Sequence, residues 1–107
     1  MQAGNLDRRI TVERKTVSNT PLGATETWLK LVTTWASRKD VSDGEKAASG
    51  TAISTVASRF VVRSTPDTRA IRPADRLTEG RLTFEIVGIK ELGRADWLEI
   101  TAQARLD

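Results

Sequence analysis

RLTEGRLTFEI, residues 76–86, predicts a tight β-hairpin. In its second half leucine, phenylalanine and isoleucine alternate with polar residues, which is the pattern of a strand with one buried face. Gly80 stands where a short turn needs a positive φ, a conformation open to glycine without steric cost. We therefore expect a short strand around residues 76–77 to pair with a strand that begins at Leu82.

The same alternation occurs on both sides of this hairpin. It predicts a first strand over residues 9–14, another over residues 54–64 and a last one after a turn at Leu92 and Gly93. The inward positions that we expect in these three strands are Ile10 and Val12, then Val56, Phe60 and Val62, and finally Leu98, Ile100 and Ala102.

Residues 28–38 are apolar on both faces, which favours a long central strand with a bulge near Thr33 and Thr34. We expect its two tryptophans, Trp28 and Trp35, to be largely buried. The preceding residues 16–25 are polar and contain Pro and Gly at turn positions, so they predict an exposed, mobile hairpin loop.

Ser42 and Glu45 form a capping-box pattern before an Ala/Ser-rich stretch, which predicts a short helix within a loop. The fold class that follows is all-β: a small antiparallel β-barrel of about six strands, with a long loop carrying this helix between strands two and three. We expect one domain over residues 1–107, with a flexible arm at residues 1–8 and a mobile loop at residues 41–53.

The composition excludes several kinds of chemistry. The chain has 107 residues with no Cys, His or Tyr, so it offers no disulfide, no thiolate or imidazole metal site and no histidine base. Nucleotide-binding glycine motifs are also missing. The carboxylates Asp40, Asp43 and Glu45 fall in a polar stretch, which predicts solvated charges. We expect no enzyme activity, no metal and no cofactor, and no apolar stretch suits a membrane span or a secretion signal.

A mild basic surplus suggests a surface for an acidic partner. The formal net charge is +3, and arginines concentrate in residues 59–76. Arg59 and Arg63 fall on the outward face of their strand. An ordinary solvated face is the simpler interpretation of these arginines, and contact with DNA or an acidic protein is the alternative. Trp97 falls on the outward face of the last strand and is either an interface anchor or a plug at the barrel end.

Three groups of residues resemble those of a known family. They are AGNLDRRIT at residues 3–11, ETW and VTTWA at residues 26–28 and 32–36, and DRL with the later FEI at residues 75–77 and 84–86. In order and spacing they are similar to the phage head-tail joining family, which is the head completion or stopper (head closure) group of siphophages and gene transfer agents.

This resemblance implies a β-barrel subunit that forms a ring between the portal or its adaptor and the tail. The ring would line the channel for double-stranded DNA, help to retain DNA and contact the tail terminator or tail tube protein, after assembly in the host cytoplasm. The family's channel loop corresponds here to residues 42–52, which makes Asp43, Glu45, Lys46 and Thr51 the candidate channel-facing residues. The number of copies, six or twelve, and direct or adaptor-mediated portal contact stay open.

Two hypotheses connect charge to these partners. Arg8 and Arg9, with the residues before them, reach toward the adaptor; Lys46, Arg59 and Arg63 lie near DNA. The alternative is a free-standing nucleic-acid-binding barrel of OB or SH3-like type, which would bind DNA as an isolated monomer in a salt-dependent way. A small hydrolase that uses loop carboxylates ranks last, because the sequence predicts no pocket beside them.

Overall fold

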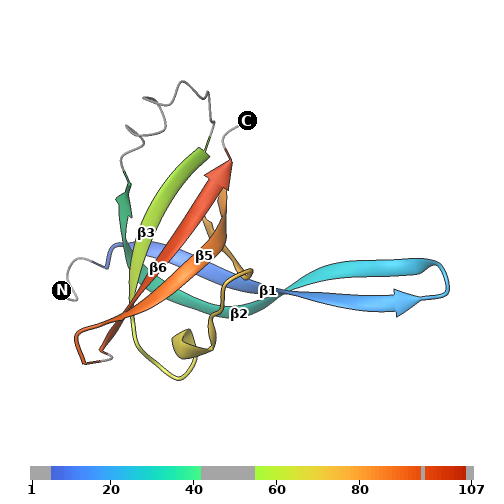
Figure 1. The fold of residues 1–107 in the computed structure, drawn as a ribbon, viewed down its shortest axis with the longest axis horizontal. Coiled ribbons are helices and arrows are strands. Elements are labelled where there is room, and N and C mark those ends of the chain that lie inside the picture. The colour runs from blue at the N-terminus through green and yellow to red at the C-terminus, as the bar shows by residue number, and fades with distance from the viewer. Residues whose placement is uncertain (1–5, 42–54, 95, 106–107) are drawn as a thin grey trace.

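The computed structural model describes residues 6–41, 55–94 and 96–105. Strands dominate these residues, and the one helical segment among them is a 3-10 turn, η2 (Thr68–Ala70). Figure 1 shows the strands as a body with one long hairpin projecting from it. The strands are β1 (Arg8–Thr20), β2 (Gly23–Asp40), β3 (Thr55–Arg63), β4 (Arg76–Glu79), β5 (Leu82–Leu92) and β6 (Trp97–Arg105).

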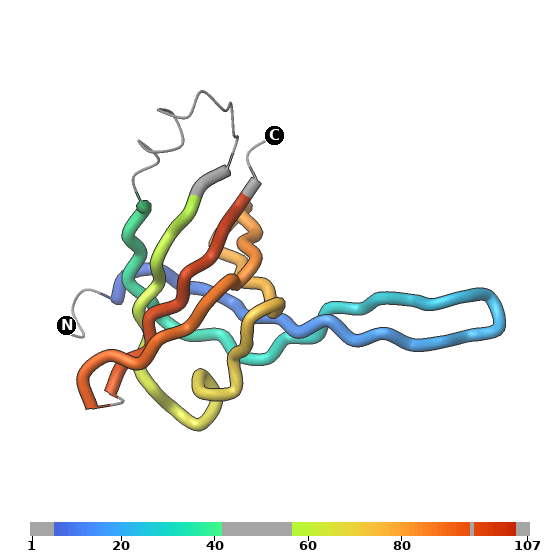
Figure 2. Tube along the Cα trace, viewed as in Figure 1, coloured from blue at the N-terminus to red at the C-terminus, as the bar shows by residue number. Residues whose placement is uncertain are grey.

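All six strands belong to one antiparallel sheet that closes on itself, in the closed-barrel order β1-β2-β3-β6-β5-β4. The closing contact is between β4 and β1, where Thr11 faces Thr78 and Val12 faces Leu77. The path of the chain around the closed sheet can be followed in Figure 2. The predicted all-β class with six antiparallel strands is therefore confirmed, while the short helix predicted in the loop after β2 lies outside the described residues.

The 76–86 hairpin forms as predicted. β4 pairs with β5 from Glu79 and Leu82 onward, and Gly80 adopts a φ of 59° in the turn. Inside the closed sheet the two phenylalanines meet: the rings of Phe60 and Phe84 are 5.1 Å apart between centroids, at 79° to each other. Every strand adds apolar side chains around this pair. The core includes Ile10, Val12, Ala36, Val62, Leu77, Ile86, Leu98, Ile100 and Ala102.

Most predicted inward positions are therefore confirmed, and the side chain of Val56 lies outside the described part. The tryptophan prediction was wrong for Trp35, which is 50% exposed. Trp28 is only half-buried. Strand alternation explains the error, because β2 turns the small Ala36 toward the core and so turns its neighbour Trp35 outward. The large rings that fill the core come from β3 and β5 instead.

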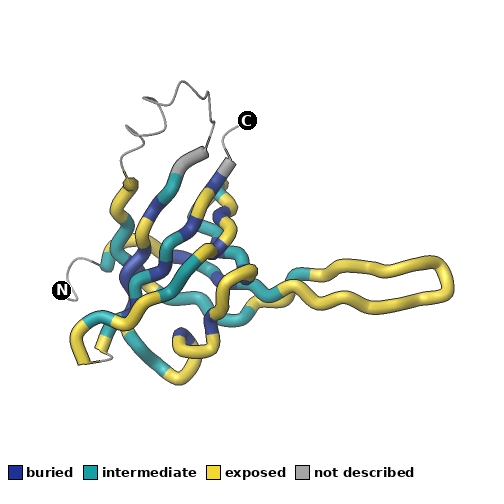
Figure 3. The backbone as a smooth tube through the Cα atoms, viewed as in Figure 1, coloured by how far each residue is buried: buried dark blue, intermediate teal, exposed yellow. Residues whose placement is uncertain are grey.

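Residues 16–25 are exposed and turn at Pro21 and Leu22, as predicted, but they are not a loop, because β1 and β2 continue to pair until Thr20 faces Gly23. We call residues 15–30 the ribbon. Its residues are exposed except for Trp28, as Figure 3 shows by colour. A β-bulge separates it from the body: Val12 pairs with Val32 and Glu13 with Lys30, which leaves Leu31 as the extra residue. The bulge was predicted in this strand, two positions further on.

The projecting ribbon makes the molecule elongated. The radius of gyration is 15.4 Å, whereas a compact domain of this length would have about 13 Å. Isolated two-stranded ribbons are marginally stable in water, since they bury little apolar surface. Tertiary contacts at the root must therefore hold the ribbon in its direction.

Candidate interaction site

Among the described residues, the most exposed large apolar side chain lies in the outer half of the ribbon, residues 16–25, which we call the distal ribbon. Leu22 at its tip is 99% exposed, and Val17 is 55% exposed. Residues 16–25 carry no charge, in a chain in which 29% of residues are charged. An uncharged strand pair with exposed leucine and valine is costly to leave in water and is typical of a surface that a partner covers.

At the root of the ribbon, Arg14 joins β1 to the loop before β4. Its Nε and Nη2 atoms donate to the two carboxylate oxygens of Asp75, both at 3.0 Å, and Nη2 also donates to the carbonyl of Ala70 at 2.6 Å. The same carboxylate accepts the amide of Arg72 at 2.9 Å. The hydrogen bond to Asp75 raises the pKa of Arg14. Because two hydrogen bonds join the guanidinium group to the carboxylate, they fix the orientation of the Arg14 side chain as well as its distance from Asp75.

A second arginine holds the other strand of the ribbon. Arg76 of β4 donates from Nε to Glu13 at 2.7 Å and places its guanidinium carbon 4.3 Å from the centre of the Trp28 ring. Beside these residues lies an open groove of about 660 Å³, lined among others by Lys15, Trp28 and Glu85. The root is thus clamped on both strands, whereas the ribbon beyond it has no support from the body.

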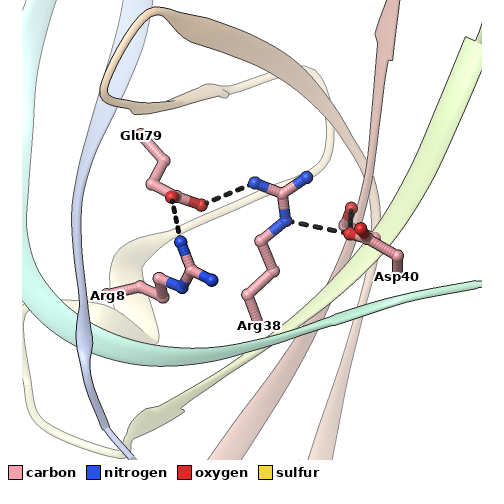
Figure 4. Close-up of polar contacts among 5 residues, drawn as sticks. Arg8, Arg38, Asp40 and Glu79 are labelled. Carbon is pink, nitrogen blue, oxygen red and sulfur yellow. Dashed lines mark hydrogen bonds and ion pairs between the residues drawn. The ribbon is translucent and has the colours of Figure 1, made fainter.

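One end of the closed sheet carries a cluster of four charged side chains, drawn in Figure 4. Glu79 accepts hydrogen bonds from Arg38 at 3.0 Å and from Arg8 at 3.3 Å. Arg38 also donates to Asp40 at 2.9 Å, and its guanidinium carbon lies 5.3 Å from the centre of the Phe84 ring. The cluster therefore joins β1, β2 and β4 over the edge of the core.

Asp40 connects this cluster to β3. The buried hydroxyl of Ser58 donates to its carboxylate at 2.7 Å. This hydrogen bond, followed by that from Arg38, lowers the pKa of Asp40 below its ordinary value. The charged cluster formed around Arg38 and Glu79 was not predicted from the sequence. The alternation in β2 could have indicated its position, because Arg38 is two residues from the buried Ala36 and so faces the same side of the strand.

The predicted site residues fall on different parts of the structure. Arg8 is the first residue of β1 and pairs with Glu79, whereas we expected it in the flexible arm. Arg9 stacks on the exposed Trp35, with 5.2 Å between the guanidinium carbon and the ring centre. Arg63 stacks in the same way on the half-buried Trp97, at 5.1 Å, and Arg59 is exposed on β3. The candidate channel residues Asp43, Glu45, Lys46 and Thr51 lie outside the described residues.

Neither a metal site nor a membrane-spanning helix is found among the described residues. Within residues 6–41, 55–94 and 96–105, no three carboxylates gather in a way that could hold a metal ion. Across the same ranges, no helix is long and apolar enough to cross a membrane. Every buried side-chain polar atom in the described part has a hydrogen-bond partner.

A closed six-stranded sheet with a projecting hairpin defines the chain as a small all-β protein. Its sequence matches the family model described as phage head completion protein over residues 1–105. The chain belongs to the phage head completion protein family, as its N-terminal and tryptophan-containing segments indicated.

Two solved structures resemble the chain over nearly its whole length. One is the solution structure of protein SF1141 from Shigella flexneri 2a, with 29% identity, a TM-score of 0.70, and coverage of 100% of this chain and 99% of that one. The other belongs to the virion of a native gene transfer agent particle, with 26% identity, a TM-score of 0.71, and coverage of 94% and 96%. No curated protein sequence matches the chain significantly.

Proposed function

We propose that this protein is a structural head-tail connector of a phage or gene transfer agent virion, a head completion or stopper subunit that acts by binding and not by catalysis. Family membership over residues 1–105 and the virion relative support a structural role in the particle. The observation that carries the proposal is the uncharged, exposed distal ribbon, because an assembly subunit needs such a surface for its neighbours.

In this proposal, copies associate around a closed ring between the portal or its adaptor and the tail terminator or tail tube. Each copy then needs two different complementary surfaces, since ring contacts between identical subunits are heterologous. The ribbon of one copy supplies the first surface and reaches beyond its own body. The loop with Asp43, Glu45, Lys46 and Thr51 faces the DNA channel and helps to retain DNA.

Charged residues outside the loop face the other partners. Arg8 and Arg9 lie toward the adaptor, and the outward Arg59 and Arg63 of β3 contact DNA or an acidic partner.

The direct experiment deletes the gene from the particle that encodes it. We expect heads that lack tails and lose DNA, and we expect imaging of complemented particles to place density for the protein at the head-tail junction. A protein in which a two-residue turn replaces residues 16–25 should fold, because the core is untouched, but should fail to complement. Complete, infectious particles after deletion would disprove the connector role.

The second candidate is a stand-alone nucleic-acid-binding β-barrel, favoured by the exposed basic residues Arg59 and Arg63. It requires the isolated chain to bind a short DNA duplex with an affinity that falls steeply as salt rises. Titration of a fluorescent duplex at increasing salt separates the two functions, since the connector needs no such binding by the monomer.

A further inference from the structure

Four outward side chains form a continuous row across neighbouring strands. Arg9 of β1 faces Trp35 of β2, and Arg63 of β3 faces Trp97 of β6. The pair Ala36 and Val62 sets the register between β2 and β3, so the next position brings Trp35 beside Arg63. We call Arg9, Trp35, Arg63 and Trp97 the Arg-Trp row; it alternates cation and aromatic ring over four strands.

The row is not required by the core of the closed sheet. Its members alternate with buried neighbours, such as Ala36 and Leu98, and so point away from the core. Half of the Trp35 surface is exposed. An outward tryptophan keeps apolar surface that a partner can cover, and tryptophan and arginine are among the residues most enriched in binding hot spots.

The arginines of the body fall into two groups, and the two of the row belong to the group that forms no ion pair within the described residues, together with others such as Arg59, Arg81 and Arg94. Arg8, Arg14, Arg38 and Arg76 each form an ion pair with a carboxylate. Within the described ranges, Arg9 and Arg63 contact aromatic rings and form no ion pair. Their positive charge is therefore available to an acidic group from outside.

A small hollow lies in the middle of the row. Its volume is about 260 Å³, and its lining residues are Leu6, Thr34, Trp35 and Arg63. The hollow has an apolar side, from leucine and the indole ring, and a cationic edge from the guanidinium group. This combination fits a segment that carries an apolar side chain next to a carboxylate.

We propose that the Arg-Trp row binds an acidic segment of a neighbouring protein in the particle, with carboxylates on Arg9 and Arg63 and an apolar side chain in the hollow. This inference rests on the proposed connector function and names one of its docking surfaces. It joins Arg9 and Arg63, which the sequence had assigned to different partners, in one site for a protein. Duplex DNA fits less well, because the stacking of neighbouring base pairs hides the base faces on which tryptophan would stack.

The first test uses tryptophan fluorescence of the full-length protein. The probes are a short peptide of alternating Glu and Leu, the same peptide with Gln for Glu, and a short DNA duplex. We expect the Glu peptide alone to change the emission, and a Trp35→Phe variant to lose most of the change. In Arg9→Gln/Arg63→Gln, affinity should fall by about tenfold or more, since both charge contacts are lost.

The matched control is Arg81→Gln/Arg94→Gln, which removes the same charge from two exposed turn positions outside the row. It should bind the Glu peptide like the unchanged protein. No response to the Glu peptide, an equal response to the Gln peptide, unchanged binding by Arg9→Gln/Arg63→Gln, or a response to the duplex in place of the Glu peptide would overturn the inference.

A second test separates this inference from the connector function. Particles deleted for the gene are complemented with the unchanged protein, with Arg9→Gln/Arg63→Gln or with Arg81→Gln/Arg94→Gln, after circular dichroism has shown that each variant folds. We expect the row variant alone to leave heads without tails. If deletion blocks assembly but the row variant restores it, the Arg-Trp row is not a docking site and the connector role stands. Normal assembly after deletion instead removes the connector role.

Discussion

Arg38 and Glu79 close one end of the sheet with a hydrogen-bonded ion pair of 3.0 Å, and only 15% and 13% of their side-chain surfaces are exposed. The Arg38 guanidinium also lies over the Phe84 ring, so the charged group covers this part of the core. Glu79 is shared by two arginines, because its carboxylate also accepts a hydrogen bond from Arg8. Because little of either side chain is exposed, water and salt screen this pair less than an ordinary surface ion pair, and the loss of one partner leaves the other poorly hydrated.

Glu79→Gln should lower the free energy of unfolding by about 1–3 kcal/mol, because it leaves two arginines beside a neutral group in a poorly solvated place. The measurement is urea unfolding followed by tryptophan fluorescence. Glu85→Gln on the neighbouring strand is the control, since Glu85 is exposed and should change stability by less than about 0.5 kcal/mol. Equal effects of the two variants would contradict a special role for Glu79.

Asp40 makes the stability of this end depend on pH. Its pKa in the folded protein is lowered, first by the hydrogen bond from Ser58 and then by that from Arg38, from an ordinary value of 3.8. The folded state therefore binds a proton less readily than the unfolded chain. The resulting stability is fully present above the ordinary pKa and is lost as the pH falls through the lowered one.

Asp40→Asn should accordingly flatten the dependence of unfolding on pH in the acid range, while Ser58→Ala should shift that dependence toward higher pH. Urea midpoints at neutral pH and at several acidic values give the measurement, with Asp67→Asn at an exposed loop position as control. An unchanged acid profile in Asp40→Asn would show that Asp40 does not gain its charge stabilisation from the fold.

Gly80 tests the hairpin that the sequence predicted first. Its φ of 59° lies in the left-handed region, and a Cβ there would meet no atom within 4 Å. Gly80→Ala should therefore destabilise through backbone strain alone, by about 1 kcal/mol. Gly88→Ala is the matched control, because Gly88 has equal space but no left-handed φ. Thermal unfolding of both variants decides whether the turn conformation carries the cost.

Much of the closed sheet could be predicted from alternation, but the identity of the buried face could not where both faces are apolar. In β2 the pattern allowed Trp35 or its neighbours to face inward, and size favoured tryptophan. The structure solves the packing with Phe60 and Phe84 inside and Ala36 opposite them, which depends on the whole set of strands. Local pattern contains no information on such a choice.

The ribbon and the charged cluster escaped prediction for a related reason. Residues 16–25 have no alternation to indicate a strand, because neither face of the ribbon meets the core. Their extended pairing follows from the continued register of β1 with β2 and from many Thr and Val residues. Arg38 and Glu79 are far apart in the chain, and only closure of the sheet brings them together.

Leu22 tests whether the ribbon tip is used for assembly. Leu22→Ser should leave the free energy of unfolding within about 0.5 kcal/mol of the unchanged protein, because the side chain is 99% exposed. It should reduce incorporation of the protein into particles, measured by immunoblotting of purified virions. Val87→Ser, at a 45% exposed position on the body, is the control and should incorporate normally. Normal incorporation of Leu22→Ser would assign assembly to another surface.

Asp75 tests whether the root of the ribbon sets its direction. This carboxylate is buried, holds Arg14 with two hydrogen bonds of 3.0 Å and accepts the amide of Arg72. Asp75→Asn removes the charge and one of the acceptor positions, so we expect a loss of about 1–3 kcal/mol of stability. Hydrogen exchange should become faster for amides of residues 15–30 than for those of β5 and β6, because the body keeps its core while the clamp on β1 is weakened.

The control is Lys15→Gln, which removes an exposed ion pair of 3.7 Å to Glu26 and should alter neither stability nor exchange at the root. Uniformly faster exchange in Asp75→Asn would instead mean that Asp75 supports the closed sheet as a whole and that the ribbon takes its direction from the strand register alone.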